Sequence, residues 1–136
     1  YMEATSTPQG GDLGLQGTRG AEVLKLWLGL QHLGLDGIDG LITGALDRRQ
    51  HLADLLDPLP LTVLPGDLHL LSFHHRSLEG LEAISWRDRV HQALLDQHLW
   101  LSKPSLAGQP LLKAVLGNPF TGERELQQIA AVLQSS

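Results

Sequence analysis

The chain has 136 residues, 42% of them hydrophobic, which is the size of one domain able to bury a core. Its formal net charge of −5 excludes the basic footprint of nucleic-acid or anionic-membrane binding, and no apolar run is long enough to span a membrane. The absence of cysteine excludes disulfides, thiolate zinc sites and a cysteine nucleophile, and it fits a cytoplasmic protein.

The first residues look irregular. The chain starts with Tyr1, and its only methionine is Met2. Because translation starts at methionine, we interpret the sequence as a cleavage product or an excerpt of a longer chain. Residues 3–11 are polar and contain several glycines and a proline, which is typical of a mobile loop. Exposed mobile loops are preferred sites of chain cleavage.

A strongly apolar helix is predicted over residues 19–33, with Thr18 as its N-cap and Gly34 as its C-terminal stop. Two apolar stripes run along it, so the helix has to be buried on most sides. A chain of this length rarely covers such a helix alone, and we therefore expect it at a subunit or domain interface. The stripes are Leu24, Trp27 and Leu28, and Leu26, Leu30 and Leu33.

A second helix is predicted over residues 37–56, with Asp36 as its N-cap, and Pro58 and Pro60 end it. Its apolar face consists of Ile38, Leu41, Ile42, Ala45, Leu52, Leu55 and Leu56. Asp39, Asp47 and a pair of arginines lie among its polar positions.

The remaining residues predict short strands alternating with helices. Strands are expected at 61–64, 68–74, 99–103 and 111–116, turns at 65–67 and 104–110, a helix at 86–98 capped by Ser85, and a last helix at 123–133 capped by Thr121. This order indicates an α+β domain with a small antiparallel sheet covered by helices.

Motifs for several kinds of chemistry are missing. The seven histidines form no HExxH motif and no metal-ligand spacing, so no metal site is expected. The sequence has no GxSxG elbow and no Walker or dinucleotide fingerprint. Residues 34–40 are glycine-rich, but they join two predicted helices and follow no strand, which disfavours phosphate binding.

Residues 11–34 read GDLGLQGTRGAEVLKLWLGLQHLG. This segment resembles the group II pyridoxal-phosphate-dependent amino-acid decarboxylases, in particular the glutamate and cysteine-sulfinate decarboxylase branch. In that family a GDxxxQxxR stretch runs directly into an apolar helix containing KLW or KFW. The matching residues are Gly11, Asp12, Gln16, Arg19, Lys25, Leu26 and Trp27.

The resemblance continues downstream. The segment 99–102, then Leu106 and Gly108, then Lys113, then Asn118-Pro119 is similar to the closing stretch of the family, although Lys113 replaces the usual arginine. The resemblance implies the C-terminal small domain of a fold-type I pyridoxal-phosphate enzyme. It divides the chain into 1–17, the end of the mobile catalytic loop and linker; 18–57, a helical segment at the large domain and dimer interface; and 58–136, the small α+β domain.

Arg19 is the predicted substrate-binding residue. A guanidinium holds a carboxylate through two charge-assisted hydrogen bonds, and the resemblance implies that the arginine at this motif position binds a substrate carboxylate. An arginine in a first helical turn is disfavoured by the helix dipole, so another interaction should justify it. A salt bridge or a solvated surface position is the alternative.

Tyr1 is the predicted catalytic residue. Enzymes of this family carry a tyrosine on a mobile loop upstream of the arginine, and it is proposed to protonate the substrate carbon after CO2 has left. A phenol is a competent proton donor when its pKa and position are tuned. A terminal tyrosine at an arbitrary cut is the alternative, and a free amino terminus there would mean a broken loop.

The cofactor implied by the resemblance is pyridoxal 5′-phosphate, which needs a Schiff-base lysine and a carboxylate facing the pyridine nitrogen. In the family this lysine follows a histidine. The lysines here are Lys25, Lys103 and Lys113, and none follows histidine. We therefore expect the cofactor to be held mainly by a missing N-terminal part, in a homodimer-type assembly. A non-catalytic interaction module derived from such a domain is the alternative.

Overall fold

The structure is a computed structural model that describes residues 22–136. The chain divides into two compact units, Tyr1–Asp36 and Gly37–Ser136. The first described element is the helix α1 (Glu22–Leu56), whose regular backbone is interrupted at Gly34 with φ 65° and ψ −177°. Only glycine adopts this left-handed φ without strain. The break therefore lies at the glycine that was predicted to stop the first helix.

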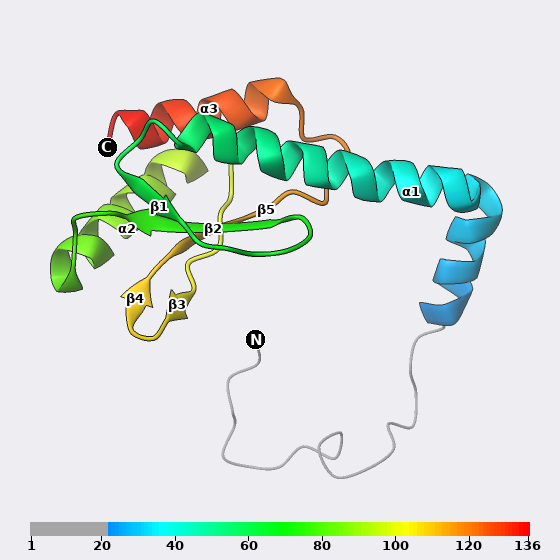
Figure 1. Cartoon of the computed structure of the whole chain (residues 1–136), viewed down its shortest axis with the longest axis horizontal. Helices are drawn as coiled ribbons and strands as arrows, with labels where there is room; N and C mark the ends of the chain where they lie inside the picture. Colours follow the sequence, from blue (N-terminus) through cyan, green and yellow to red (C-terminus); the bar gives the residue numbers. More distant parts are fainter. Residues whose placement is uncertain (1–21) are drawn as a thin grey trace, which may run out of the picture. The chain divides into compact units, whose positions relative to one another are not determined.

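The second unit continues from α1 into a small mixed fold (Figure 1). Its elements after α1 are β1 (Leu61–Val63), β2 (Leu70–His75), α2 (Gly80–Leu95), β3 (Ser105–Leu106), β4 (Gln109–Pro110), β5 (Leu112–Val115) and α3 (Glu123–Gln134). A three-stranded antiparallel sheet has the order β1-β2-β5, and β3 and β4 form a separate hairpin. The predicted α+β class with a small antiparallel sheet and helices is confirmed.

Helices cover one face of the sheet. On β2, Leu71 and Phe73 are buried, and in the strand register they lie opposite Ala114 and Leu112 of β5, which are buried as well. Each fully buried leucine or phenylalanine contributes about 1.5–3 kcal/mol. The helices add Leu52 and Leu56 from α1, Trp86, Val90 and Leu94 from α2, and Leu126, Ile129, Val132 and Leu133 from α3.

The outer edge of β1 is protected from pairing with another strand. The Leu61 amide donates to the Leu59 carbonyl at 2.7 Å, and the Leu61 carbonyl accepts a hydrogen bond from Arg76 Nη2 at 2.9 Å. Unpaired edge groups invite association with a second sheet. The Arg76 side chain therefore occupies a backbone acceptor that a second strand would need in order to pair with this edge.

Two predicted elements, the helix at 86–98 and the strand at 99–103, differ in extent from the structure. The helix α2 begins at Gly80, so Ser85 lies inside it and does not cap it. Leu81, in the first turn of this helix, is 81% exposed. Because it does not face the core, the first turn does not show the apolar spacing from which a helix is predicted. The predicted strand 99–103 is reduced to one bridge between Ser102 and Lys113.

The last helix is capped one residue later than predicted. Gly122, and not Thr121, is the N-cap of α3, and its amide donates to Glu125 Oε2 at 2.9 Å. The shift places a glutamate at the third helical position, where it closes back on the N-cap. The hydrogen bond from Gly122, and then the one from Arg124, hold the pKa of Glu125 below its usual value of 4.5.

The predicted turn at 104–110 is the β3–β4 hairpin. Its two central residues, Ala107 and Gly108, both have positive φ, 49° and 83°. This is the pattern of a type I′ turn, which asparagine and glycine fill best. Glycine adopts positive φ without strain, which suits position 108.

Replacing Ala107 by asparagine should stabilise the chain, because asparagine tolerates the left-handed backbone that alanine adopts only with strain. We expect the free energy of unfolding to rise by about 0.5–1 kcal/mol in urea titrations. Gly108→Ala should lower it by about 1–2 kcal/mol, although a Cβ there meets nothing within 4 Å. Equal stabilities for the three proteins would contradict the turn assignment.

The lowered pKa of Glu125 predicts a loss of stability in acid. The unfolded chain takes up this proton first as the pH falls, so the contribution is complete above about pH 4.5 and is lost as the pH falls through the folded-state pKa. Urea midpoints measured from about pH 6 to about pH 3 should therefore fall less steeply for Glu125→Gln than for the wild type. Glu82→Gln on α2 is the matched control, and an identical pH slope in all three would refute the link.

Candidate functional site

The two predicted site residues, Tyr1 and Arg19, lie outside the described residues. The end of the same motif, Lys25-Leu26-Trp27, lies in the described part of α1. Seven large apolar side chains between positions 23 and 35 are 41–81% exposed in the single chain. The helix was predicted to be buried on most sides. A contiguous apolar surface of this kind marks an interaction site. The seven are Val23, Leu24, Leu26, Trp27, Leu28, Leu33 and Leu35.

The described residues do not fit a pyridoxal-phosphate site. Lys103 Nζ lies 3.1 Å from Asp88 Oδ1 at the surface, and this hydrogen bond, with the contact from Arg87, lowers the pKa of Asp88. Lys113 lies on β5 opposite Ser72. The carboxylate beside Lys103 is bound to the lysine ammonium itself, so this pair does not supply a Schiff-base lysine with a separate carboxylate facing the pyridine nitrogen, which the cofactor needs.

Among residues 22–136, no group of three or more histidine or acidic side chains is placed to hold a metal ion. Over the same range, no helix combines the length and the apolar character needed to cross a membrane.

Two arginines of α1 fasten the helix to one end of the sheet. Arg49 donates from Nε to the Leu70 carbonyl at 3.1 Å and from Nη2 to the Gly66 carbonyl at 2.8 Å. Arg48 Nε donates to the Leu116 carbonyl at 3.0 Å. Gly44 gives the Arg48 guanidinium room, because a Cβ there would lie 3.3 Å from Nη1. The pair fixes the loop before β2 and the segment after β5 to the same helix.

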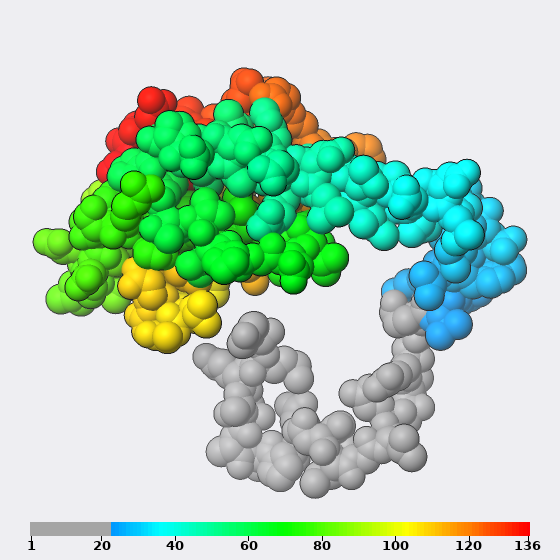
Figure 2. All heavy atoms as spheres, in the orientation of Figure 1, coloured from blue at the N-terminus to red at the C-terminus, as the bar shows by residue number. Residues whose placement is uncertain are grey.

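Beside these arginines lies an apolar hollow of about 380 Å³, which we call the leucine cleft. Figure 2 shows the segment between β1 and β2 beside α1 on this side of the molecule. The cleft collects residues from three separate parts of the sequence. They are Leu41, Ile42, Ala45 and Leu46 of α1, Leu68 and His69 before β2, and Gly117 after β5.

The sheet face away from the helices carries an exposed apolar row. Leu70 lies opposite Val115 in the register of β2 and β5. The bridge between Ser102 and Lys113 places Trp100 next to Val115 on the other side. Exposed fractions are 38% for Leu70, 50% for Val115 and 68% for Trp100. This face is a second candidate for contact with another protein part.

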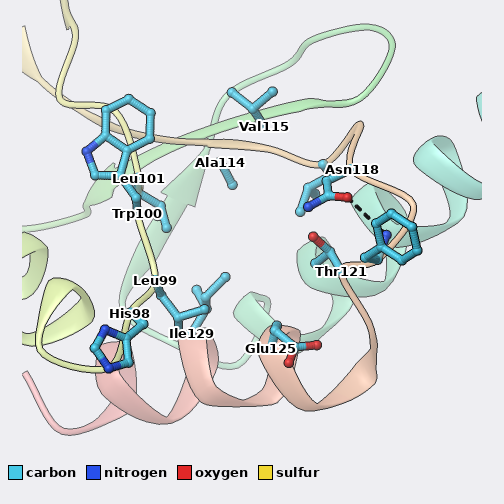
Figure 3. Close-up of a pocket in the computed structure, with 12 residues that line it drawn as sticks. His98, Leu99, Trp100, Leu101, Ala114, Val115, Asn118, Thr121, Glu125 and Ile129 are labelled. Atoms are coloured by element: carbon cyan, nitrogen blue, oxygen red, sulfur yellow. Dashed lines mark hydrogen bonds between the residues drawn. The ribbon is translucent and has the colours of Figure 1, made fainter.

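A further pocket of about 360 Å³ lies where the 98–101 segment and β5 separate (Figure 3). Two of its polar side chains are used locally. The Asn118 side-chain oxygen accepts the Phe120 amide at 3.0 Å, and the Glu125 carboxylate is held by the Gly122 amide and by Arg124. Leu99, Leu101 and Ile129 line it with apolar groups. The pocket therefore combines these two engaged side chains with an apolar lining, and His98 and Thr121 also line it.

Comparison with known proteins gives a match in structure only. No family model matches the chain, and no curated protein matches it. The Catharanthus roseus tryptophan decarboxylase in complex with L-tryptophan superposes with a TM-score of 0.72 and 16% identity, over 82% of this chain and 24% of that chain. Mouse CSAD superposes with a TM-score of 0.64 and 15% identity, over 100% of this chain and 33% of that one.

A third match is the glutamate decarboxylase domain of diaminobutyrate-pyruvate transaminase and L-2,4-diaminobutyrate decarboxylase from Vibrio parahaemolyticus, with a TM-score of 0.66 and 15% identity, over 84% of this chain and 25% of that chain. The chain has the fold of the C-terminal part of these decarboxylases. It spans only about a quarter to a third of their length. This decarboxylase-like fold agrees with the fold that the motif implied.

Arg49→Lys should destabilise the chain although it keeps the charge. A lysine ammonium is a point donor and cannot reproduce the fork that joins two carbonyls, so we expect a loss of about 1–2 kcal/mol in the free energy of unfolding. Arg124→Lys is the control, since the Arg124 side chain is 83% exposed and surface pairs contribute little. Equal losses for both variants would show that the fork of Arg49 is unimportant.

Proposed function

We propose that this chain is the C-terminal part of a group II pyridoxal-phosphate-dependent L-amino-acid decarboxylase, which releases the α-carboxylate as CO2 and leaves an amine. The agreement between two independent observations carries the proposal. The GDxxxQxxR motif leads into α1, and the fold of the following residues is that of the C-terminal part of decarboxylase structures.

The cofactor belongs to another part of the enzyme. The described residues do not fit pyridoxal phosphate, and most of each similar chain has no counterpart here. An N-terminal large part would hold the cofactor, which acts as the electron sink when it is bound. The exposed apolar residues between 23 and 35 and the row Leu70–Val115–Trp100 provide surfaces for that part and for a homodimer-type assembly. We place this assembly in the cytoplasm.

Within this assembly, Arg19 would bind a substrate carboxylate through its paired N–H groups. This contact orients the substrate so that the bond to the departing carboxylate is aligned for cleavage, a positioning effect. Tyr1 would supply the proton that replaces CO2 at the substrate carbon. The role of Arg19 rests on its position in the motif, and the role of Tyr1 rests on its position in the predicted loop upstream of Arg19.

We propose an acidic or diamino acid as the substrate, namely glutamate, cysteine sulfinate, aspartate or 2,4-diaminobutyrate. The arginine motif supports this group over aromatic amino acids. The fold does not decide the matter, because the matched structures include a tryptophan decarboxylase and a 4-hydroxyphenylacetaldehyde synthase from Rhodiola rosea.

A non-catalytic interaction module is the second candidate. The described residues offer a large exposed apolar surface on α1 and no cofactor site. A module of this kind would bind a partner through that surface and would not take part in catalysis.

The proposal is tested by joining the chain to the polypeptide encoded immediately upstream of Tyr1. Co-expression should give a yellow complex that releases CO2 from one of the four proposed substrates. Arg19→Met should then lower kcat/KM by roughly 100-fold, since it removes a charge-assisted pair, while Arg19→Lys should retain part of the activity. Absorption spectra and CO2 release are the measurements.

One result would contradict the proposal, and another would contradict only the role of Arg19. A colourless complex without activity would favour the interaction module. An active complex in which Arg19→Met loses nothing would remove Arg19 from the substrate site and leave the decarboxylase assignment standing.

A further inference from the structure

We propose that the leucine cleft is a preformed docking site for the N-terminal cofactor-binding part, and that Leu68 is its principal contact. This inference rests on the proposed function, since it names where that partner binds. The cleft is lined by apolar side chains of α1 on one side and by Leu68, His69 and Gly117 on the other.

The first argument is that Leu68 has a strained backbone and an exposed apolar side chain in the free chain. Its φ is 58°, in the left-handed region that disfavours any residue with a bulky side chain. Its side chain is also 63% exposed. A leucine that is both strained and exposed gains nothing from the fold of the free chain. Such strain persists at sites where it serves binding.

The second argument is that the walls of the cleft are fixed before any partner arrives. Arg49 bonds the carbonyls of Gly66 and Leu70 on either side of Leu68. Arg48 bonds the Leu116 carbonyl next to Gly117. The His69 ring packs so closely on Gly117 that a Cβ there would lie 3.1 Å from it. A site ordered in advance loses less entropy on binding.

The third argument concerns the occupant. A second copy of the chain is the alternative occupant, since a two-fold interface could set other apolar residues of one copy into the cleft of the other. The matched decarboxylases are three to four times longer than the region they share with this chain, which spans 24–33% of them. The missing part is therefore the source of the apolar side chains that fit the cleft.

Leu68→Asn separates docking from folding. Asparagine tolerates the left-handed backbone, so the variant should unfold at a higher urea concentration than the wild type. It also removes the apolar contact, and burial of one leucine corresponds to roughly 10–100-fold in affinity. We expect the dissociation constant for the polypeptide encoded upstream of Tyr1 to rise by at least about 10-fold. Titration calorimetry measures it.

The matched control is Ala107→Asn, which makes the same kind of change in the separate β3–β4 hairpin. Ala107 also has positive φ, 49°, and it does not line the cleft. This variant should gain stability and leave the dissociation constant unchanged. Gly117→Ala, which pushes the His69 ring, should weaken docking as Leu68→Asn does.

The possible outcomes differ for the two proposals. If the wild type binds the upstream polypeptide and Leu68→Asn binds it equally well, the cleft is not the docking site although the proposed function stands. If the wild type does not bind it, the proposed function and this occupant both fail. If the chain alone self-associates in sedimentation experiments and Leu68→Asn abolishes this, the occupant is a second copy and the inference is overturned.

Discussion

Helix packing on a single face of a small antiparallel sheet governs this structure. The three helices pack against Leu71 and Phe73 on one side of the sheet, where nearly all of the described core lies. The apolar face of α1 continues beyond that core, because Leu52 and Leu56 are fully buried while Leu41 and Ile42 remain 40% and 52% exposed. The chain therefore has more apolar surface than its own sheet can cover.

Two arginines of α1 hold the segments that border the uncovered apolar surface in place. Arg48 and Arg49 use backbone carbonyls as partners, and these carbonyls belong to segments far apart in the sequence. The hydrogen bonds hold Leu68 outward in a left-handed backbone, which a free loop would relax. A surface that is strained, apolar and held rigid is consistent with a part that completes its packing elsewhere.

The chemistry of the proposed enzyme is divided in the same way. The described residues supply a scaffold and contact surfaces, and Lys103 and Asp88 pair with each other at the surface. In the pocket near Trp100, the Asn118 side chain is used by its own turn and the Glu125 carboxylate by the cap at Gly122. Reactive groups would come from Arg19 and Tyr1 and from the cofactor-binding part.

The sequence by itself determined the fold class, the helix over 37–56, the break at Gly34 and the family that the motif resembles, because periodicity, glycine conformation and residue order are local properties. Only the tertiary structure decided the start of α2, where Leu81 points outward, and the single bridge at Ser102, since both depend on what lies across from them. The leucine cleft could not be predicted, because its walls come from segments that are distant in the sequence. Arg48 and Arg49 hold these segments together through backbone carbonyls, and any residue has such a carbonyl. Tyr1 and Arg19 stay predictions from sequence, since they lie outside the described residues.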